Sequence, residues 1–162
     1  MLNLRKRELP AVEKRYDLPL YLAGEDSKEC YLKFEARAAG RVNPLYTAAV
    51  EQNAKRIRVR QMLADQIRED TSATPEAYVD ATYEGVKQSG RDRLTALYDA
   101  CMINWSSNIL NGDAVIEASR ENFLALAEAR VPEIADALAD FEKACNEAGE
   151  IQAIDDEEER GN

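Results

Sequence analysis

Side chains that could take part in chemistry are unevenly represented in this sequence of 162 residues. The chain has no histidine, so Ser–His and Cys–His nucleophile arrangements and HExxH zinc sites cannot form. Its seven glycines make neither the GxGxxG nor the GxxxxGK[ST] spacing that holds the phosphates of nucleotides. These absences exclude the enzyme classes that such motifs encode.

The carboxylates are the next candidates for catalysis or metal binding. Asp136/Asp140 and Glu117/Glu121 are spaced at i and i+4, so each pair would share one face of a helix. Acidic helical surfaces contain this spacing by chance, and a catalytic carboxylate needs burial or a cleft that perturbs its pKa. An EF-hand calcium loop is also absent from the sequence. We therefore expect no catalytic, metal-binding or cofactor-binding residue and a protein that is not an enzyme.

The three cysteines are Cys30, Cys101 and Cys145, an odd number without CxxC spacing. Each lies on the apolar face of its predicted element, where a free cysteine behaves as a small hydrophobic residue. We expect packed, reduced thiols, as in a cytosolic protein.

The strongest basic cluster is "KRIRVR" at residues 55–60. On a helix, Arg56 and Arg60 would share a face while Arg58 points elsewhere. A helix-turn-helix could be built from this helix and the next, and this gives an alternative function: a small DNA-binding regulator. However, a recognition helix presents basic or amide side chains to DNA. The second helix has Lys87 as its one cation beside three acids, Glu76, Asp80 and Glu84, so a solvated face or a protein contact is the favoured interpretation.

Charge is distributed asymmetrically along the chain. The net charge is −10; residues 1–70 contain 14 Lys and Arg and 11 Asp and Glu, whereas residues 71–162 contain 7 and 20. An acidic protein disfavours nonspecific nucleic-acid binding, but its field steers association with protein partners of opposite charge. An acidic accessory subunit of an enzyme is therefore a third alternative.

Hydropathy predicts a protein that neither spans a membrane nor is secreted. Hydrophobic residues make up 45% of the chain and charged residues 32%, as in a soluble globular protein. The longest apolar stretch is shorter than the roughly 20 residues of a membrane span. The N-terminal residues include charges but no apolar signal-peptide core. We expect a cytoplasmic protein.

Alternation of apolar residues predicts a β-hairpin over residues 17–37. Residues 18–22 alternate before a polar turn at Gly24–Lys28, and residues 30–36 alternate after it. A lone hairpin is marginally stable in water, so it must pack on the helices. The fold class expected is α+β: a mostly α-helical domain with an N-terminal hairpin.

Helix-capping residues divide the remainder, residues 43–149, into predicted helices. The predicted helices are Pro44 to about Glu69, Pro75 to near Gly90, Leu94 to Ile109 before the Asn111-Gly112 turn, one capped by Ser119, and one from Pro132 to Gly149. The domain is predicted to span residues 17–149, between a flexible basic segment at 1–16 and a disordered acidic tail at 150–162. The tail contains five consecutive acids, which repel one another.

The sole tryptophan is predicted to belong to the core. Trp105 ends an apolar stripe that begins at Leu94, Gly112 lies in a turn, and Ser119 caps the next helix. Phe123 and Leu126 of that helix can then return against the indole.

The order of these features resembles the tail assembly chaperones of long-tailed, siphovirus-like bacteriophages. That family combines a Val/Leu strand, an acidic-glycine turn and a Phe strand, which Leu18–Leu22, Gly24–Asp26 and Phe34 match. A second block has a Trp, a Gly turn, Ser-x-Glu-Asn before a Leu-rich helix, and a hydrophobic–proline step. Its counterparts here are Trp105, Gly112, Ser119, Glu121, Asn122, Leu124 and Val131-Pro132. The resemblance covers residues 17–37 and 98–145 and is weaker over 41–92.

The resemblance implies a non-enzymatic chaperone of tail assembly in the host cytoplasm. Such a protein keeps the tape measure protein soluble, helps recruit tail tube subunits and leaves before the virion is complete. Self-association is left open, and neither a membrane nor a nucleic acid is an expected partner. The candidate partner-binding residues are Arg56, Arg60, Asp155, Asp156, Glu157, Glu158 and Glu159.

Overall fold

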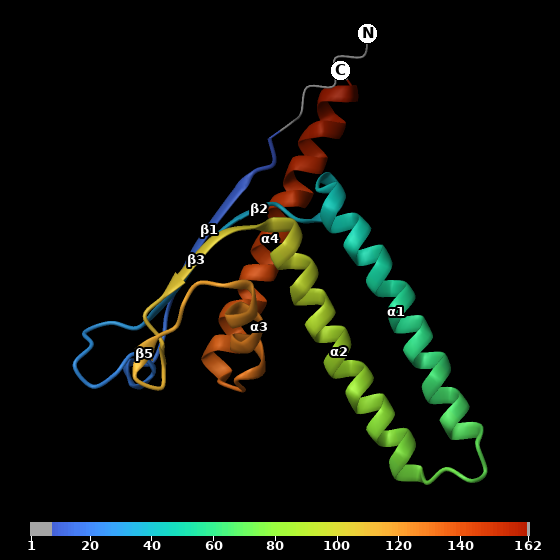
Figure 1. Cartoon of the computed structure of the whole chain (residues 1–162). Coiled ribbons are helices and arrows are strands. Elements are labelled where there is room, and N and C mark those ends of the chain that lie inside the picture. The colour runs from blue at the N-terminus through green and yellow to red at the C-terminus, as the bar shows by residue number, and fades with distance from the viewer. Residues whose placement is uncertain (1–7, 162) are drawn as a thin grey trace.

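A computed structural model describes residues 8–161, in which a small sheet and two helices form a body and two further helices form a long hairpin that projects from it (Figure 1). The strands are β1 (Ala11–Asp17), β2 (Tyr31–Arg37), β3 (Met102–Ser107), β4 (Leu110–Asn111) and β5 (Ala114–Val115). The helices are α1 (Pro44–Glu69), α2 (Pro75–Cys101), α3 (Arg120–Glu128) and α4 (Pro132–Gly161), with short 3-10 turns η1 (Leu20–Leu22) and η2 (Gly40–Val42). This confirms the predicted α+β class.

The sheet is antiparallel with the order β1-β2-β3. In its register, Phe34 of the central strand pairs with Lys14 on one side and with Trp105 on the other. Side chains alternate along β2, and Leu32, Phe34 and Ala36 are fully buried. One face of the sheet therefore carries the core, as period-two patterning requires.

The predicted hairpin exists, but its first strand lies earlier in the chain than residues 18–22. β1 covers Ala11–Asp17, and Leu20–Leu22 form the turn η1 instead. The N–H of Leu18 donates to the carbonyl oxygen of Cys30 at 2.8 Å, and Pro19 then ends the pairing because proline has no N–H to donate. The prediction of a flexible segment at 1–16 is thus wrong for residues 11–16, and residues 1–7 lie outside the described part.

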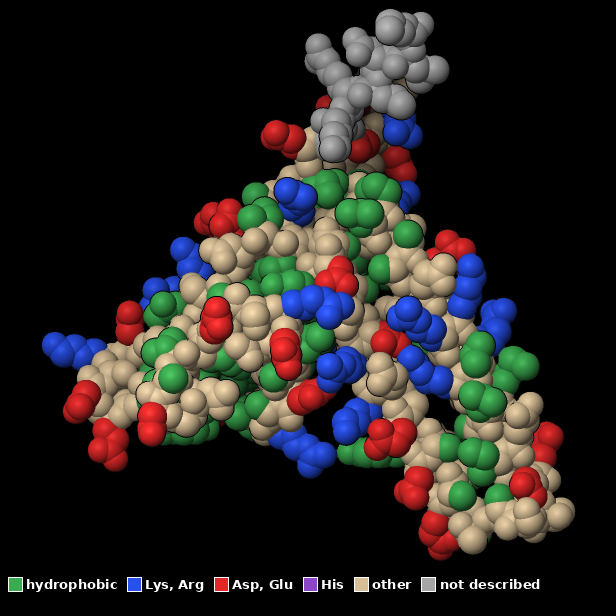
Figure 2. Space-filling model, viewed as in Figure 1, with side chains coloured by type: hydrophobic (Ala, Val, Ile, Leu, Met, Phe, Trp, Pro, Cys, Tyr) green, Lys and Arg blue, Asp and Glu red, His purple; other side chains and the backbone are tan. Residues whose placement is uncertain are grey.

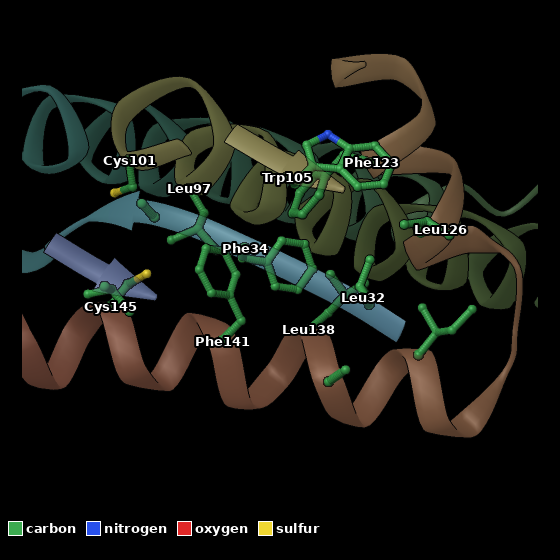
Figure 3. Close-up of a cluster of buried hydrophobic side chains, with 14 of the residues drawn as sticks. Leu32, Phe34, Leu97, Cys101, Trp105, Phe123, Leu126, Leu138, Phe141 and Cys145 are labelled. Carbon is green, nitrogen blue, oxygen red and sulfur yellow. The ribbon is translucent and has the colours of Figure 1, made fainter. Parts of the chain in front are cut away.

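Phe34 is the centre of the core (Figure 3). Its ring stacks on Phe141 of α4 with 4.4 Å between centroids and meets the edge of Phe123 of α3 at 5.9 Å. Leu97 of α2 is buried in the same cluster. Sheet, α2, α3 and α4 therefore share one hydrophobic core.

Trp105 lies on a strand, not at the end of a helix as predicted. α2 ends at Cys101, and residues 102–107 pair with β2. Ile103 and Trp105 favour a strand, and the pairing of β3 satisfies an otherwise open edge of β2, with a register shift that leaves Ile103 unpaired. The predicted burial is confirmed: Trp105 is 3% exposed, its Nε1–H donates to the carbonyl oxygen of Ser119 at 3.2 Å, and its ring lies 6.3 Å from Phe123.

Three predicted helix starts are confirmed by their caps, whereas the start predicted at Leu94 is wrong because α2 runs unbroken from Pro75 to Cys101. The side chains of Asn43, Thr74 and Ser119 accept hydrogen bonds from backbone N–H groups three residues later, at 3.2, 3.3 and 3.1 Å. Asn43 is also buried, and its amide donates to the carbonyl oxygens of Ala38 and Ala100 at 3.0 and 3.1 Å. This residue therefore ties the start of α1 to the end of α2.

Two helix ends that were predicted at glycines are wrong as well. α2 continues through Gly90, and α4 continues through Gly149 to Gly161. Gly149 is a packing residue: a Cβ there would lie 1.8 Å from the carbonyl oxygen of Ala39. Beyond it, Ala153 is buried. The end of α4 therefore packs on the rest of the protein, although the sequence predicted disorder there from repulsion among the acids.

The predicted disordered tail at 150–162 is therefore helical over its described residues. Arg41 Nη1 lies 2.9 Å from Glu157 Oε1, and Gln152 donates to Asp156 at 2.6 Å one helical turn along. These contacts offset repulsion among neighbouring carboxylates. None of the helices between residues 8 and 161 is long and apolar enough to cross a membrane.

Candidate partner-binding groove on the helical hairpin

The hairpin formed by α1 and α2 is anchored to the body at one end and extends well past it (Figure 1). Asn43 and Tyr46 are buried at the anchored end, and Ala96, Leu97, Ala100 and Cys101 are buried where α2 returns. Between residues 47 and 95, Ala64 alone is buried. Two helices without a third layer have no core of their own, so this distal part lacks the cover that amphipathic helices normally have.

Polar contacts hold the two helices together. Arg60 of α1 pairs with Asp92 of α2 and also donates to Ser89 Oγ at 3.0 Å. Asn53 donates to the backbone oxygen of Asp92 at 3.1 Å. Partial burial alone would raise the pKa of Asp92, but hydrogen bonds from Arg60 and Gln88 and the nearby arginine charges outweigh it, so this pKa is lowered.

The apolar stripe of α2 continues from the core onto the projecting part. Leu97 and Cys101 are buried in the body, whereas Val79, Tyr83 and Val86 at helical spacing on the same side are 62%, 58% and 69% exposed. The apolar stripe therefore extends past the body onto the exposed, projecting part of α2.

Of this stripe, Val86 lies between the two helices, where α1 contributes Val50 and Ile57, which are 44% and 49% exposed. Together the helices enclose an open groove with a volume of about 780 Å³. Its lining includes the small residues Ala54, Ala81 and Gly85. Small residues between two helices let the backbone of a third helix approach closely, so the groove has the form of a helix-binding site.

One edge of the groove is cationic. A neighbouring hollow of about 440 Å³ between α2 and α3 is lined by Lys87, Arg91, Arg93 and Arg130 with a single acid, Glu128. Arg91 pairs with Glu128 and Arg93 with Glu142, whereas Lys87 and Arg130 have no ion-pair partner among residues 8–161. Figure 2 shows Lys and Arg side chains gathered where the hairpin leaves the body and hydrophobic side chains further along it.

The structure separates the partner-binding residues predicted from sequence into two groups. Arg56 and Arg60 do share a face of α1, but both approach Asp92, with Arg56 Nη1 at 3.9 Å. Both therefore link α1 to α2 through Asp92, Arg60 as a partly buried side chain and Arg56 as an exposed one. Asp155, Asp156, Glu157, Glu158 and Glu159 lie on the last turns of α4, at the opposite end of the molecule from the hairpin tip (Figure 1).

The groove itself was not predicted from the sequence. In the sequence, Val50 and Ile57 belong to the apolar residues of the first long helix and Val86 to those of the second, and nothing distinguishes them from residues that face a core. Helical periodicity gives the direction of each face but not whether another element covers it. The available signal is the length of the two helices, 26 and 27 residues, beside a small sheet and a nine-residue α3.

The cysteines and the carboxylates considered as candidates for chemistry take part in packing and hydrogen bonds. Burial raises the pKa of the Cys101 thiol to about 11 and that of Cys145 to about 12, and all three cysteines are buried and unpaired. Tyr16 donates a hydrogen bond to Asp140 Oδ2 at 2.6 Å. In the described part of the chain, His, Cys, Asp and Glu side chains form no group of three that could hold a metal ion.

Comparison of the chain with protein-family models, with curated proteins and with solved structures gave no match.

Proposed function

We propose that the protein is a non-enzymatic chaperone of phage tail assembly that covers apolar helical segments of the tape measure protein. The observation that carries the proposal is the open groove between α1 and α2, in which Val50, Ile57 and Val86 are 44%, 49% and 69% exposed. A surface of this kind on a projecting element is typical of a binding site for another chain.

The physical basis is the burial of apolar surface on both partners. A tape measure chain is long and helical, and its apolar stripes would aggregate if left in water. Laying such a stripe into the groove removes both surfaces from water, at about 25 cal/mol per Å² buried. Completing the burial of a half-exposed Val or Ile contributes about 1 kcal/mol, so several contacts along the groove are needed for useful affinity.

The resemblance to tail assembly chaperones supports the rest of the proposal. The protein acts in the host cytoplasm, keeps the tape measure protein soluble, helps recruit tail tube subunits and is not part of the mature virion. The acidic end of α4 and the cationic edge of the groove give it two surfaces of opposite charge for these partners.

Co-expression with a tape measure fragment tests the proposal. The wild-type protein should keep the fragment in the supernatant, and Ile57→Asp or Val86→Asp should leave it in the pellet. Val115→Asp is the matched control because Val115 is 57% exposed and lies in β5, on the opposite side of the body (Figure 1). Equal amounts of soluble fragment with Val86→Asp and wild type would refute the assignment of the groove.

The alternative of a DNA-binding regulator has its own test. A salt-dependent shift of duplex DNA by the purified protein, lost on replacing Lys55 and Arg58, would support it.

A further inference from the structure

The C-terminal end of α4 has the properties of a ligand for a helix-binding groove. Ile151 and Ile154 are 62% and 49% exposed, although they lie on a helix whose other side packs through Gly149 and Ala153. The two isoleucines are one turn apart and therefore share a face. Carboxylates surround them on that face: Glu147, Glu150, Asp155 and Glu158, all exposed.

The groove between α1 and α2 is complementary to this helix end in both shape and charge. Its apolar lining includes Val50, Ile57 and Val86, and the hollow at its edge contains Lys87 and Arg130. An acidic helix with an apolar face matches a groove with an apolar floor and a cationic edge.

One chain cannot join these two surfaces to each other. The end of α4 runs away from the hairpin (Figure 1), and α4 is held in that direction by packing of Gly149 on Ala39 and by the Arg41–Glu157 pair. Contact between the surfaces therefore requires two copies.

We propose that the groove of one copy binds the C-terminal end of α4 from a second copy. The interface joins two different surfaces, so it is heterologous and leaves a groove and a helix end unoccupied at the extremities of each assembly. Copies therefore add head to tail. This proposal does not rest on the chaperone function, since it requires no client.

The small size of the proposed interface between two copies predicts how strongly the copies associate. Two isoleucines and a few ion pairs form a small interface, of the class that gives weak association. We expect association in the micromolar range that weakens at least tenfold between low salt and 0.5 M salt, because charge complementarity contributes to it.

Analytical ultracentrifugation of the full chain tests the proposal without any client. The average mass of the wild-type protein should rise with concentration. A groove variant, Val86→Asp, and a helix-end variant, Ile151→Ser/Ile154→Ser, should each associate at least tenfold more weakly. Val115→Asp is the control and should behave as wild type.

Mixing the two variants provides the decisive comparison. The groove variant retains an intact helix end and the helix-end variant an intact groove, so a mixture should form dimers but no longer assemblies. Association that survives in Ile151→Ser/Ile154→Ser and is lost in Val86→Asp would overturn the proposal, because it would mean that hairpins pair with one another. A wild-type protein that stays monomeric at several hundred micromolar would also overturn it, whatever the outcome of client binding.

Discussion

Arg60 on α1 and Asp92 on α2 form an ion pair between the two helices of the projecting hairpin. Asp92 is 11% exposed at its side chain and Arg60 is 25% exposed, and Ser89 and Asn53 add hydrogen bonds to the same cluster. Because Ala64 alone is buried between residues 47 and 95, polar contacts of this kind contribute more to holding the hairpin together than they would in a packed bundle.

Asp92→Asn should lower the free energy of unfolding by about 1 kcal/mol at pH 7, since it removes a partly buried, hydrogen-bonded ion pair. The pKa of Asp92 is lower in the folded protein. Its contribution is therefore present above the unfolded pKa, near 4, and is lost as the pH falls through the folded pKa. Denaturant unfolding of both proteins between pH 7 and pH 3 should show the difference shrinking; a difference independent of pH would contradict the assignment.

Trp105→Ala should destabilise the protein by about 3–5 kcal/mol, because it removes a large, buried aromatic side chain beside Phe123. Trp105→Phe is the informative comparison. It keeps an aromatic ring but loses the hydrogen bond to Ser119, and it should cost less than the alanine variant. Thermal unfolding measures both, and an unchanged transition for Trp105→Ala would show that the indole is not part of the core.

Gly149→Ala should destabilise the protein by about 1–3 kcal/mol or more, because the added methyl group would overlap the backbone carbonyl of Ala39. Gly90→Ala is the matched control. Gly90 is also inside a long helix, but no atom lies within 4 Å of its added Cβ, so the gain in helix propensity should stabilise by about 0.5–1 kcal/mol. Shifts of the same sign in the two melting temperatures would refute the packing role of Gly149.

The thiols of Cys101 and Cys145 should react slowly in the folded protein. Burial raises their pKa values to about 11 and about 12, so both thiolate fraction and access are small at pH 8. Labelling with a maleimide, followed by peptide mass spectrometry, should show modification at least a hundredfold slower than in denaturant. Rapid labelling of Cys101 without denaturant would contradict its burial.

Local patterns in the sequence predicted the three capped helix starts correctly, for a physical reason. Asn43, Thr74 and Ser119 act within a few residues of themselves, since each side chain caps an N–H group three positions later. Burial of Trp105 could be predicted because an aromatic residue in an apolar run packs into the core in either secondary structure.

The predictions that failed depended on tertiary contacts. Gly149 resembles a helix terminator locally, but the close approach of Ala39 makes glycine necessary inside α4. Residues 102–107 continue an apolar helical pattern, yet they form a strand that pairs with the open edge of β2. The groove escaped prediction for the same reason, because the cover of a helix face is a property of the whole fold.

Hydrogen exchange in the presence of a tape measure fragment tests the chaperone proposal most directly. The distal hairpin has little burial, so its amides should exchange rapidly in the free protein. Binding in the groove should protect residues 50–61 of α1 and 79–93 of α2, and Val86→Asp should abolish this protection while Val115→Asp leaves it intact. Protection confined to the sheet, α3 or α4, with the hairpin amides exchanging as in the free protein, would contradict the proposed binding site.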